Sequence, residues 1–221
     1  GLANVFVSLL SIYKGEWRGK RLLDGKEVPI INAFFEETSD LGAPKPLQEN
    51  KRRMFEGCHF QGDGFIISNE HANQLCLPKP SNCEVIHPLI NGQELNNDPA
   101  QKPGRSIINF RNWSIERAAQ YTEPFSIVRE KVKPERDASH EKPLRERWWI
   151  YTRTSAEAYR IIKDTPRGCV VSRHTKHLNF SALPTRYVFT DALKILASDR
   201  WDIYAIMQVS LHEVWARKYS G

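Results

Sequence analysis

The segment at residues 107–136 constrains the fold more than any other part of the chain. An apolar run over residues 106–110 is typical of a strand. Ser114 then precedes a helical pattern that reaches Tyr121, and serine is favoured at a helix N-terminus. A second, basic helix is expected from Pro124 to about Val132, because Pro134 and the position before it disfavour its continuation. The segment therefore predicts a strand followed directly by two helices.

The remaining elements are short and show no regular strand–helix–strand alternation. Strands are expected at residues 5–13, twice within 55–68, and at 147–152, 168–173, 178–183 and 187–196, with helices over 70–75, 155–164 and 199–218. The run at 28–35 fits either a strand or the start of a helix. This order predicts an α+β fold with mixed, mainly antiparallel sheets, packed helices and a long C-terminal helix.

Several local signals position these elements. Asp24 and Gly25 form a dipeptide that tolerates positive φ and so predicts a tight turn. Ser68 is placed to cap the helix over 70–75. The prolines at 44 and 46 mark a candidate boundary at 42–46. The C-terminal helix is predicted from apolar residues at spacings of three and four: Ile203, Ile206, Met207, Leu211, Val214 and Trp215.

Composition excludes some classes of protein. No apolar run approaches the 18 residues that suggest a membrane span, so we expect no membrane association. The N-terminal apolar run lacks a preceding basic stretch, which argues against a signal peptide. The four cysteines show no C-x-x-C spacing, which favours isolated thiols in a reducing cytoplasm over a zinc site. A cytoplasmic protein of bacterial or archaeal origin is expected.

Positive charge is concentrated in one third of the chain. Residues 101–176 contain 17 Lys and Arg against 9 Asp and Glu, although the whole chain carries a net charge of only +6. Such a surplus favours a polyanionic partner, because neutralising phosphates releases condensed counterions. A solvated, Lys- and Arg-rich helical face is the alternative.

The motifs of common catalytic sites are missing from the sequence. It has no Gly-x-Ser-x-Gly elbow and no His-Glu-x-x-His pair, and Gly62-Asp63-Gly64 reads as a hairpin turn because no P-loop lysine follows it. An adenine methyltransferase motif would need a Pro-Pro pair, and a common metal-dependent nuclease would need Pro-Asp; neither dipeptide occurs. We therefore expect no catalytic, cofactor-binding or metal-binding residues in this chain.

Two groups of polar residues are candidates for contact with a nucleic acid. Arg129, Lys131, Lys133 and Arg136 lie at a helix end and suit phosphates, although Glu130 and Glu135 could pair with them instead. The stretch at 172–177 lies between two strand-like runs, where it is either a polar hairpin tip or a set of base-reading side chains. Trp148 and Trp149 could stack on bases, but adjacent strand residues face opposite ways, so at least one is expected in the core.

The order of motifs resembles one known family. The motifs are the sequence FEG at 55–57 with GDGF at 62–65, NCEVIHPLIN at 82–91, the segment at 107–136, the Trp pair, and QVSLHEVWA at 208–216. In this order they are similar to the target-recognition region of the MmeI-like (type IIL) restriction–modification enzymes, single chains that cut and N6-methylate DNA. The resemblance implies a fold like the TaqI-like and type I specificity domains.

The resemblance also implies a division of labour. Residues 1–46 would link from a methyltransferase core, residues 47–198 would form the DNA target-recognition domain, and residues 199–221 would lead to a helical spacer. The partners would be double-stranded DNA and the methyltransferase and nuclease domains of the same chain, with S-adenosylmethionine and Mg²⁺ needed only by those domains. The resemblance places base reading in the loop that contains Ser172, Arg173, Thr175, Lys176 and His177.

The residues alone leave other functions open. An RNA-binding module would show the same charge and aromatic content. A protein-interaction module with a basic face for an acidic partner is the third possibility.

Overall fold

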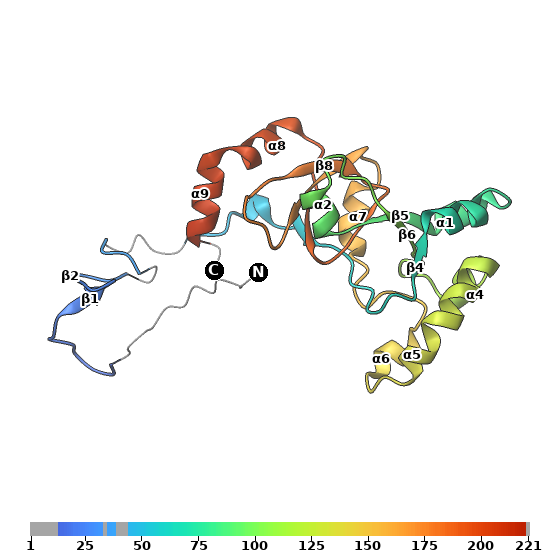
Figure 1. Ribbon diagram of the computed structural model, residues 1–221, viewed down its shortest axis with the longest axis horizontal. Coiled ribbons are helices and arrows are strands. Elements are labelled where there is room, and N and C mark those ends of the chain that lie inside the picture. Colours follow the sequence, from blue (N-terminus) through green and yellow to red (C-terminus); the bar gives the residue numbers. More distant parts are fainter. Residues whose placement is uncertain (1–12, 33–34, 39–43, 220–221) are drawn as a thin grey trace. The chain divides into compact units, whose positions relative to one another are not determined.

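The computed structural model describes residues 13–32, 35–38 and 44–219, and the chain divides into two compact units. Unit 1 comprises Gly1–Lys45 together with Lys218–Gly221, and unit 2 comprises Pro46–Arg217 (Figure 1). The break along the chain falls between Lys45 and Pro46, within the segment where two prolines interrupt regular structure.

Unit 1 contains a β-hairpin. Strands β1 (Arg21–Leu23) and β2 (Lys26–Val28) pair antiparallel. The turn between them has Asp24 at φ 48° and Gly25 at φ 79°, as a two-residue hairpin turn of the primed type requires. The predicted Asp-Gly turn is confirmed.

The run at residues 28–35 is predicted to be a strand or the start of a helix, but apart from Val28, which ends β2, its described residues form neither, so that prediction is wrong. Strand β2 ends at Val28, and Pro29 has no N–H to donate to a ladder. The Asn32 side chain then accepts a hydrogen bond from the Glu36 N–H at 3.0 Å, which turns the chain. The strand expected at 5–13 falls outside the described residues except for Tyr13, which is not in a strand.

Unit 2 is built on two four-stranded sheets. The first, in the order β3-β10-β7-β8, is antiparallel throughout and joins Met54–Glu56, Leu193–Leu196, Arg167–Ser172 and Ser181–Pro184. The second, β4-β6-β5-β9, joins Ile66–Ser68, Arg105–Ile108, Ile86–Ile90 and Val188–Phe189, and only its β5–β9 pair is parallel. The predicted α+β fold with mainly antiparallel sheets is confirmed.

The two sheets meet where the chain crosses from β9 to β10. An isolated bridge pairs Cys58 with Thr190, and the Cys58 N–H donates to the Phe189 carbonyl at 2.7 Å. A Cβ atom on Gly57 would lie 2.0 Å from the Thr190 carbonyl oxygen. Only glycine permits this approach of two backbones.

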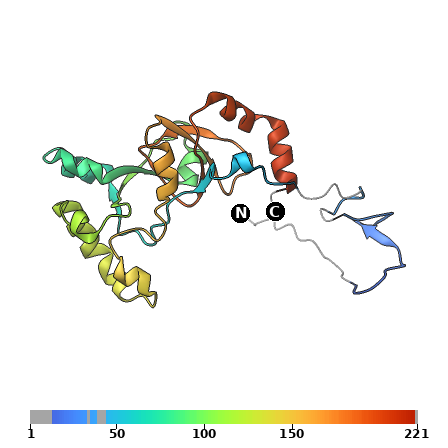
Figure 2. The same cartoon turned by 180° about the vertical axis from the view of Figure 1, so that it is seen from behind.

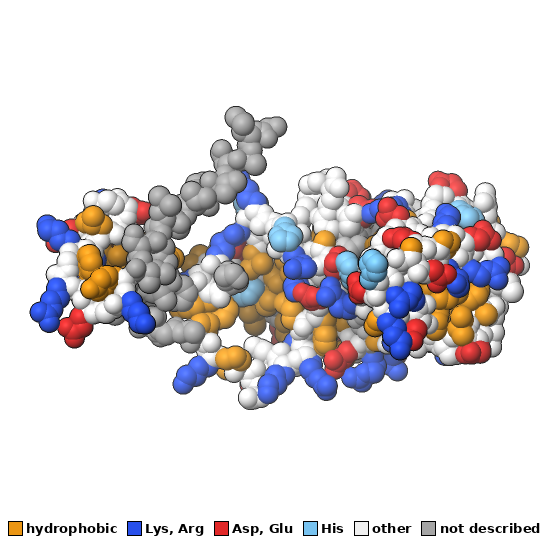
Figure 3. Space-filling view, turned by 90° about the horizontal axis from the view of Figure 1, so that it is seen from below, with side chains coloured by type: hydrophobic (Ala, Val, Ile, Leu, Met, Phe, Trp, Pro, Cys, Tyr) orange, Lys and Arg blue, Asp and Glu red, His pale blue; other side chains and the backbone are white. Residues whose placement is uncertain are grey.

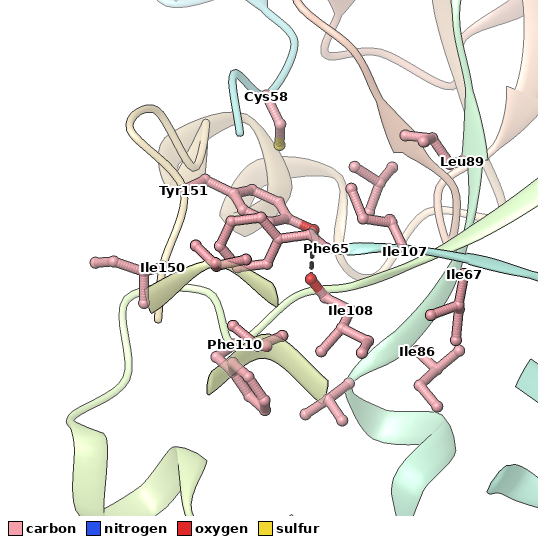
Figure 4. Close-up of a cluster of buried hydrophobic side chains, with 14 of the residues drawn as sticks. Cys58, Phe65, Ile67, Ile86, Leu89, Ile107, Ile108, Phe110, Ile150 and Tyr151 are labelled. Atoms are coloured by element: carbon pink, nitrogen blue, oxygen red, sulfur yellow. Dashed lines mark hydrogen bonds between the residues drawn. The ribbon is translucent and has the colours of Figure 1, made fainter. Parts of the chain in front are cut away.

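The core consists of two main clusters of buried side chains. One surrounds the second sheet and includes Phe65, Ile107 and Tyr151, whose hydroxyl donates to the Ile108 carbonyl at 2.7 Å (Figure 4). The other fills the side of the first sheet and includes Ile195. Residues distant in sequence therefore fix both sheets.

Short helices connect the strands of unit 2. Ser68 caps α1 (Asn69–Cys76) by accepting from the His71 N–H at 3.1 Å, and Ser114 caps α3 (Ile115–Ala118) by accepting from Arg117 N–H at 3.4 Å. Both predicted caps are confirmed. Five further helices precede the C-terminal segment: α2 (Gly92–Asn97), α4 (Thr122–Lys131), α5 (Lys133–Asp137), α6 (Lys142–Glu146) and α7 (Ala156–Ile162). Of these, α4 to α6 lie together at one end of unit 2 (Figures 1 and 2).

The strand expected at residues 147–152 is absent: residues 147–149 form a turn, and residues 150–152 follow in an irregular conformation. Tertiary contacts hold them there. Trp148 is buried and packs on Phe125 with ring centroids 5.3 Å apart, while Trp149 donates its indole N–H to the Trp113 carbonyl at 2.9 Å. The expectation that at least one tryptophan is in the core is confirmed.

The predicted single C-terminal helix is wrong, because it is broken at Val209. Helix α8 (Trp201–Gln208) and helix α9 (Ser210–Tyr219) are separated by Val209 in an extended conformation, with φ −75° and ψ 144°. The Gln208 carboxamide accepts from the Phe180 N–H at 2.9 Å and donates to the Phe180 carbonyl at 2.9 Å. These contacts compete with helix continuation at a β-branched residue of low helix propensity.

Candidate functional site

The predicted phosphate contacts at the end of α4 differ in their availability. Arg129 and Lys131 are exposed on α4, and neither has an ion-pair partner among the described residues. Lys133, the first residue of α5, pairs with Asp137 at 2.5 Å. Two of the four side chains are therefore available to a polyanion without breaking an ion pair.

Arg136 is a correction to the sequence-based prediction. Its residue is only 4% exposed, and its guanidinium donates to the carbonyls of Ile150 at 2.8 Å and Phe60 at 2.7 Å. It also lies over the Phe65 ring, 5.4 Å from the centroid. Burial lowers the pKa of this guanidinium, with nearby Glu135 acting in the opposite direction. Arg136 thus ties α5 to the core and is not accessible to DNA.

The predicted base-reading loop follows β7 and is only partly available. Ser172 is buried as the last residue of β7 and donates its hydroxyl to the His174 carbonyl at 3.1 Å, so its prediction is corrected. Thr175 donates its hydroxyl to the His177 carbonyl at 2.8 Å. Arg173, Lys176 and His177 are exposed, with Arg173 donating weakly to the Asp191 carbonyl at 3.4 Å.

The structure does not bring the two predicted groups together. Leu178, at the end of the loop, donates its N–H to Glu213 of α9, and Arg217 of α9 donates to the Lys176 carbonyl. Helix α9 and helix α4 lie at opposite ends of unit 2 (Figures 1 and 2). The loop at 172–177 and the end of α4 are therefore separate surfaces.

The basic surplus is also not a continuous patch. Within residues 101–176, Arg117 pairs with Glu84 at 3.6 Å and Arg153 with Glu56 at 2.5 Å. Figure 3 shows Lys and Arg side chains interspersed with Asp and Glu over one face. The surplus of Lys and Arg in residues 101–176 therefore does not by itself identify a binding site.

A cleft in unit 2 is lined by four cationic side chains, of which Arg160 pairs with Glu157 at 4.0 Å and Lys163 with Asp164 at 3.6 Å outside the lining. It has a volume of about 560 Å³. Arg111, Arg160, Lys163 and Arg186 line it, and none of its described lining residues is Asp or Glu. Uncharged polar and apolar side chains complete the walls: His87, Asn109, Asn112, Trp113, Thr154, Ala156, Tyr159, Thr185, Tyr187 and Val188.

Four separate parts of the chain build this cleft. Helix α7 carries Arg160, while Lys163 directly follows α7. The turn between β8 and β9 contributes Arg186, and the turn after β6 contributes Arg111. His87 lies in β5 and lines the cleft, where burial, followed by the charge of Arg111, lowers its pKa to about 4. His87 is therefore neutral at pH 7 and offers a donor and an acceptor rather than charge.

The aromatic residues at the cleft have structural partners. Trp113 stacks on Tyr121 with ring centroids 5.6 Å apart, and the Arg117 guanidinium lies 3.7 Å from the Trp113 centroid. Tyr159 donates its hydroxyl to the Tyr187 carbonyl at 3.1 Å. These contacts fix the positions of Trp113 and Tyr159 in the wall of the cleft.

Sequence reasoning missed the four cationic lining residues. Arg111 and Arg186 could have been noticed as cations in short turns that directly follow apolar strands. Their convergence with Arg160 and Lys163 depends on pairing between distant strands, which no local pattern reveals.

The described residues contain no group of three or more His, Cys, Asp or Glu side chains arranged to hold a metal ion. Among the described residues, no helix has the length and apolar content that crossing a bilayer requires. Burial raises the pKa of the Cys58 thiol to about 12, which keeps it protonated at neutral pH.

No protein-family model and no curated protein sequence matches this chain. The structure gives a different result. The fold resembles part of the type IIL restriction–modification enzyme MmeI. The compared structure contains MmeI in complex with DNA, and the superposition has a TM-score of 0.65 at 16% sequence identity. It covers 89% of this chain and 26% of the MmeI chain, so this chain spans about a quarter of that enzyme's length. The likeness to MmeI is one of fold.

Proposed function

We propose that this chain is a DNA target-recognition domain that binds double-stranded DNA. The single observation that carries the proposal is the cleft lined by Arg111, Arg160, Lys163 and Arg186, on a fold that resembles a part of DNA-bound MmeI. These four cations create a local field that attracts phosphates, and Arg111 and Arg186 contribute to it without an ion-pair partner among the described residues, whereas Arg160 pairs with Glu157 at 4.0 Å and Lys163 with Asp164 at 3.6 Å. Neutral His87 and the amides of Asn109 and Asn112 add hydrogen-bonding groups.

The exposed residues of the two predicted groups are proposed as further DNA contacts outside the cleft. Arg129 and Lys131 are proposed as phosphate contacts, because both are exposed and unpaired among the described residues. Arg173, Lys176 and His177 remain the proposed base-reading residues, and an arginine fork suits guanine N7 and O6. Arg136 and Ser172 are left out because they are buried, and Lys133 and Thr175 are left out because each already has an internal partner, Asp137 and the His177 carbonyl.

The chain is proposed to carry recognition without catalysis. Methyl transfer and cleavage would belong to methyltransferase and nuclease domains of a longer, cytoplasmic protein, which would require S-adenosylmethionine and Mg²⁺. The finer assignment to TaqI-like or type I specificity domains is proposed on the same grounds of sequence resemblance.

Duplex binding and its salt dependence test the proposal. Fluorescence anisotropy with a labelled mixed-sequence duplex is measured for the native chain and for Lys163→Ala and Arg186→Ala. We expect each substitution to lower the slope of log K against log salt by about one, because one phosphate contact is lost. Lys142→Ala is the matched control, since Lys142 is an exposed lysine on α6 that does not line the cleft.

The rival functions predict other results. Tighter binding of single- or double-stranded RNA of the same sequence would favour an RNA-binding module. Absence of salt-dependent binding to any nucleic acid would favour a protein-interaction module and refute the proposal. Equal slopes for all three variants and the native chain would remove the cleft from the binding surface.

A further inference from the structure

Arg111 has an unusual backbone conformation at the edge of the cleft. Its φ is 54°, in the left-handed region that side-chain-bearing residues rarely adopt. Holding a residue there costs on the order of 1–3 kcal/mol. Such a conformation persists only where surrounding contacts hold it in place.

A side chain two positions earlier supplies that contact. The Asn109 side-chain oxygen accepts a hydrogen bond from the Arg111 N–H at 2.8 Å, which forms an Asx turn. Asn109 is itself fixed, because it is only 7% exposed and its N–H donates to the Val85 carbonyl at 2.8 Å. The Asn109 carboxamide, which is itself fixed in place, therefore holds the Arg111 backbone in its left-handed conformation.

The rest of the turn is also anchored. Phe110 is buried between the two residues. Thr154 donates its hydroxyl to the Asn112 side chain at 2.9 Å, and the Trp113 N–H donates to the Phe110 carbonyl at 3.1 Å. The backbone of the turn that carries Arg111 is therefore held in place by contacts on both sides of this residue.

The Arg111 guanidinium is available to bind an anion. It is exposed, and no carboxylate of the described residues forms an ion pair with it. Its guanidinium lies 5.7 Å from the Trp113 ring centroid, at the wall of the cleft. Arg160, Lys163 and Arg186 share that cleft, so a bound group there meets several cations.

We infer that Asn109 is a positioning residue that presets Arg111 to bind a DNA phosphodiester in this cleft. The inference rests on the proposed function and extends it to one residue pair. A planar guanidinium binds phosphate oxygens through two parallel hydrogen bonds, and this geometry depends on orientation. Fixing the backbone beforehand reduces the ordering required on binding.

A double-mutant cycle tests this coupling. Duplex affinity and salt slope are measured for the native chain, Asn109→Ala, Arg111→Ala and the double variant. Releasing one counterion at 0.1 M salt changes affinity by about eightfold, so Arg111→Ala should weaken binding by about that factor and lower the slope by about one. Asn109→Ala should weaken binding in the native background and cause no further loss once Arg111 is alanine.

Two further variants separate positioning from folding. Asn109→Ser keeps a side-chain acceptor for the Arg111 N–H, so it should recover most of the affinity. Asn109→Leu keeps the volume but not the acceptor; if Asn109→Ala fails to fold by circular dichroism, Asn109→Leu replaces it in the cycle.

The outcomes distinguish the inference from the proposed function. If the native chain binds duplex but the two substitutions act additively, the inference is overturned and the proposed function stands. If Asn109→Ala and Asn109→Leu both bind as the native chain does, the inference is likewise overturned. If the native chain shows no salt-dependent duplex binding, the proposed function fails and the inference falls with it.

Discussion

Replacing Arg136 by methionine should destabilise the fold without changing the salt dependence of DNA binding. The substitution keeps an unbranched stem but removes the donors that reach the Ile150 and Phe60 carbonyls at 2.8 and 2.7 Å. Each buried carbonyl left without a partner costs about 1–3 kcal/mol. Removing a buried charge offsets part of this cost, so we expect a net loss of about 2–4 kcal/mol in the free energy of unfolding.

Urea unfolding followed by tryptophan fluorescence measures this loss. Arg129→Met is the matched control, because Arg129 is exposed on α4 and makes no hydrogen bond or ion pair with the described residues. It should change the unfolding free energy by less than about 0.5 kcal/mol. The two variants should behave oppositely in duplex binding, with Arg129→Met lowering the salt slope by about one. Native-like stability together with a lowered slope for Arg136→Met would refute the reasoning.

Two further predictions follow from the fold. Gly57→Ala should lower the free energy of unfolding in urea by more than about 3 kcal/mol, because its Cβ would lie 2.0 Å from the Thr190 carbonyl oxygen. The control Gly168→Ala, whose Cβ meets nothing closer than 3.9 Å, should lower it by under about 1 kcal/mol. Equal losses for the two variants would contradict the close approach at Gly57. His87 has a pKa of about 4 in the folded chain and 6.5 in its ordinary state, so the unfolded chain gains a proton first and stability is lost as pH falls from about 6.5 to 4. In His87→Gln the loss of unfolding free energy between pH 6.5 and pH 4 should be smaller than in the native chain, by roughly 3 kcal/mol at most. An unchanged pH profile would show that the folded chain does not keep His87 as neutral imidazole.

The sequence by itself determined the features that depend on a few neighbouring residues. The Asp24-Gly25 turn and the Ser68 and Ser114 caps form within two or three positions, so their chemistry is visible in the chain. The α+β class followed from the irregular order of short elements, which the two sheets confirm. These predictions succeeded because capping and turn formation need no distant partner.

Tertiary structure alone decided which polar residues are available. Arg136 and Ser172 look like their exposed neighbours in sequence, yet distant carbonyls and sheet packing bury them. Val209 ends a helix whose apolar spacing continues beyond it. The cleft joins Arg111 and Arg186 across segments 75 positions apart. Burial and convergence depend on which strands pair, and pairing is a long-range property that local residue patterns do not specify.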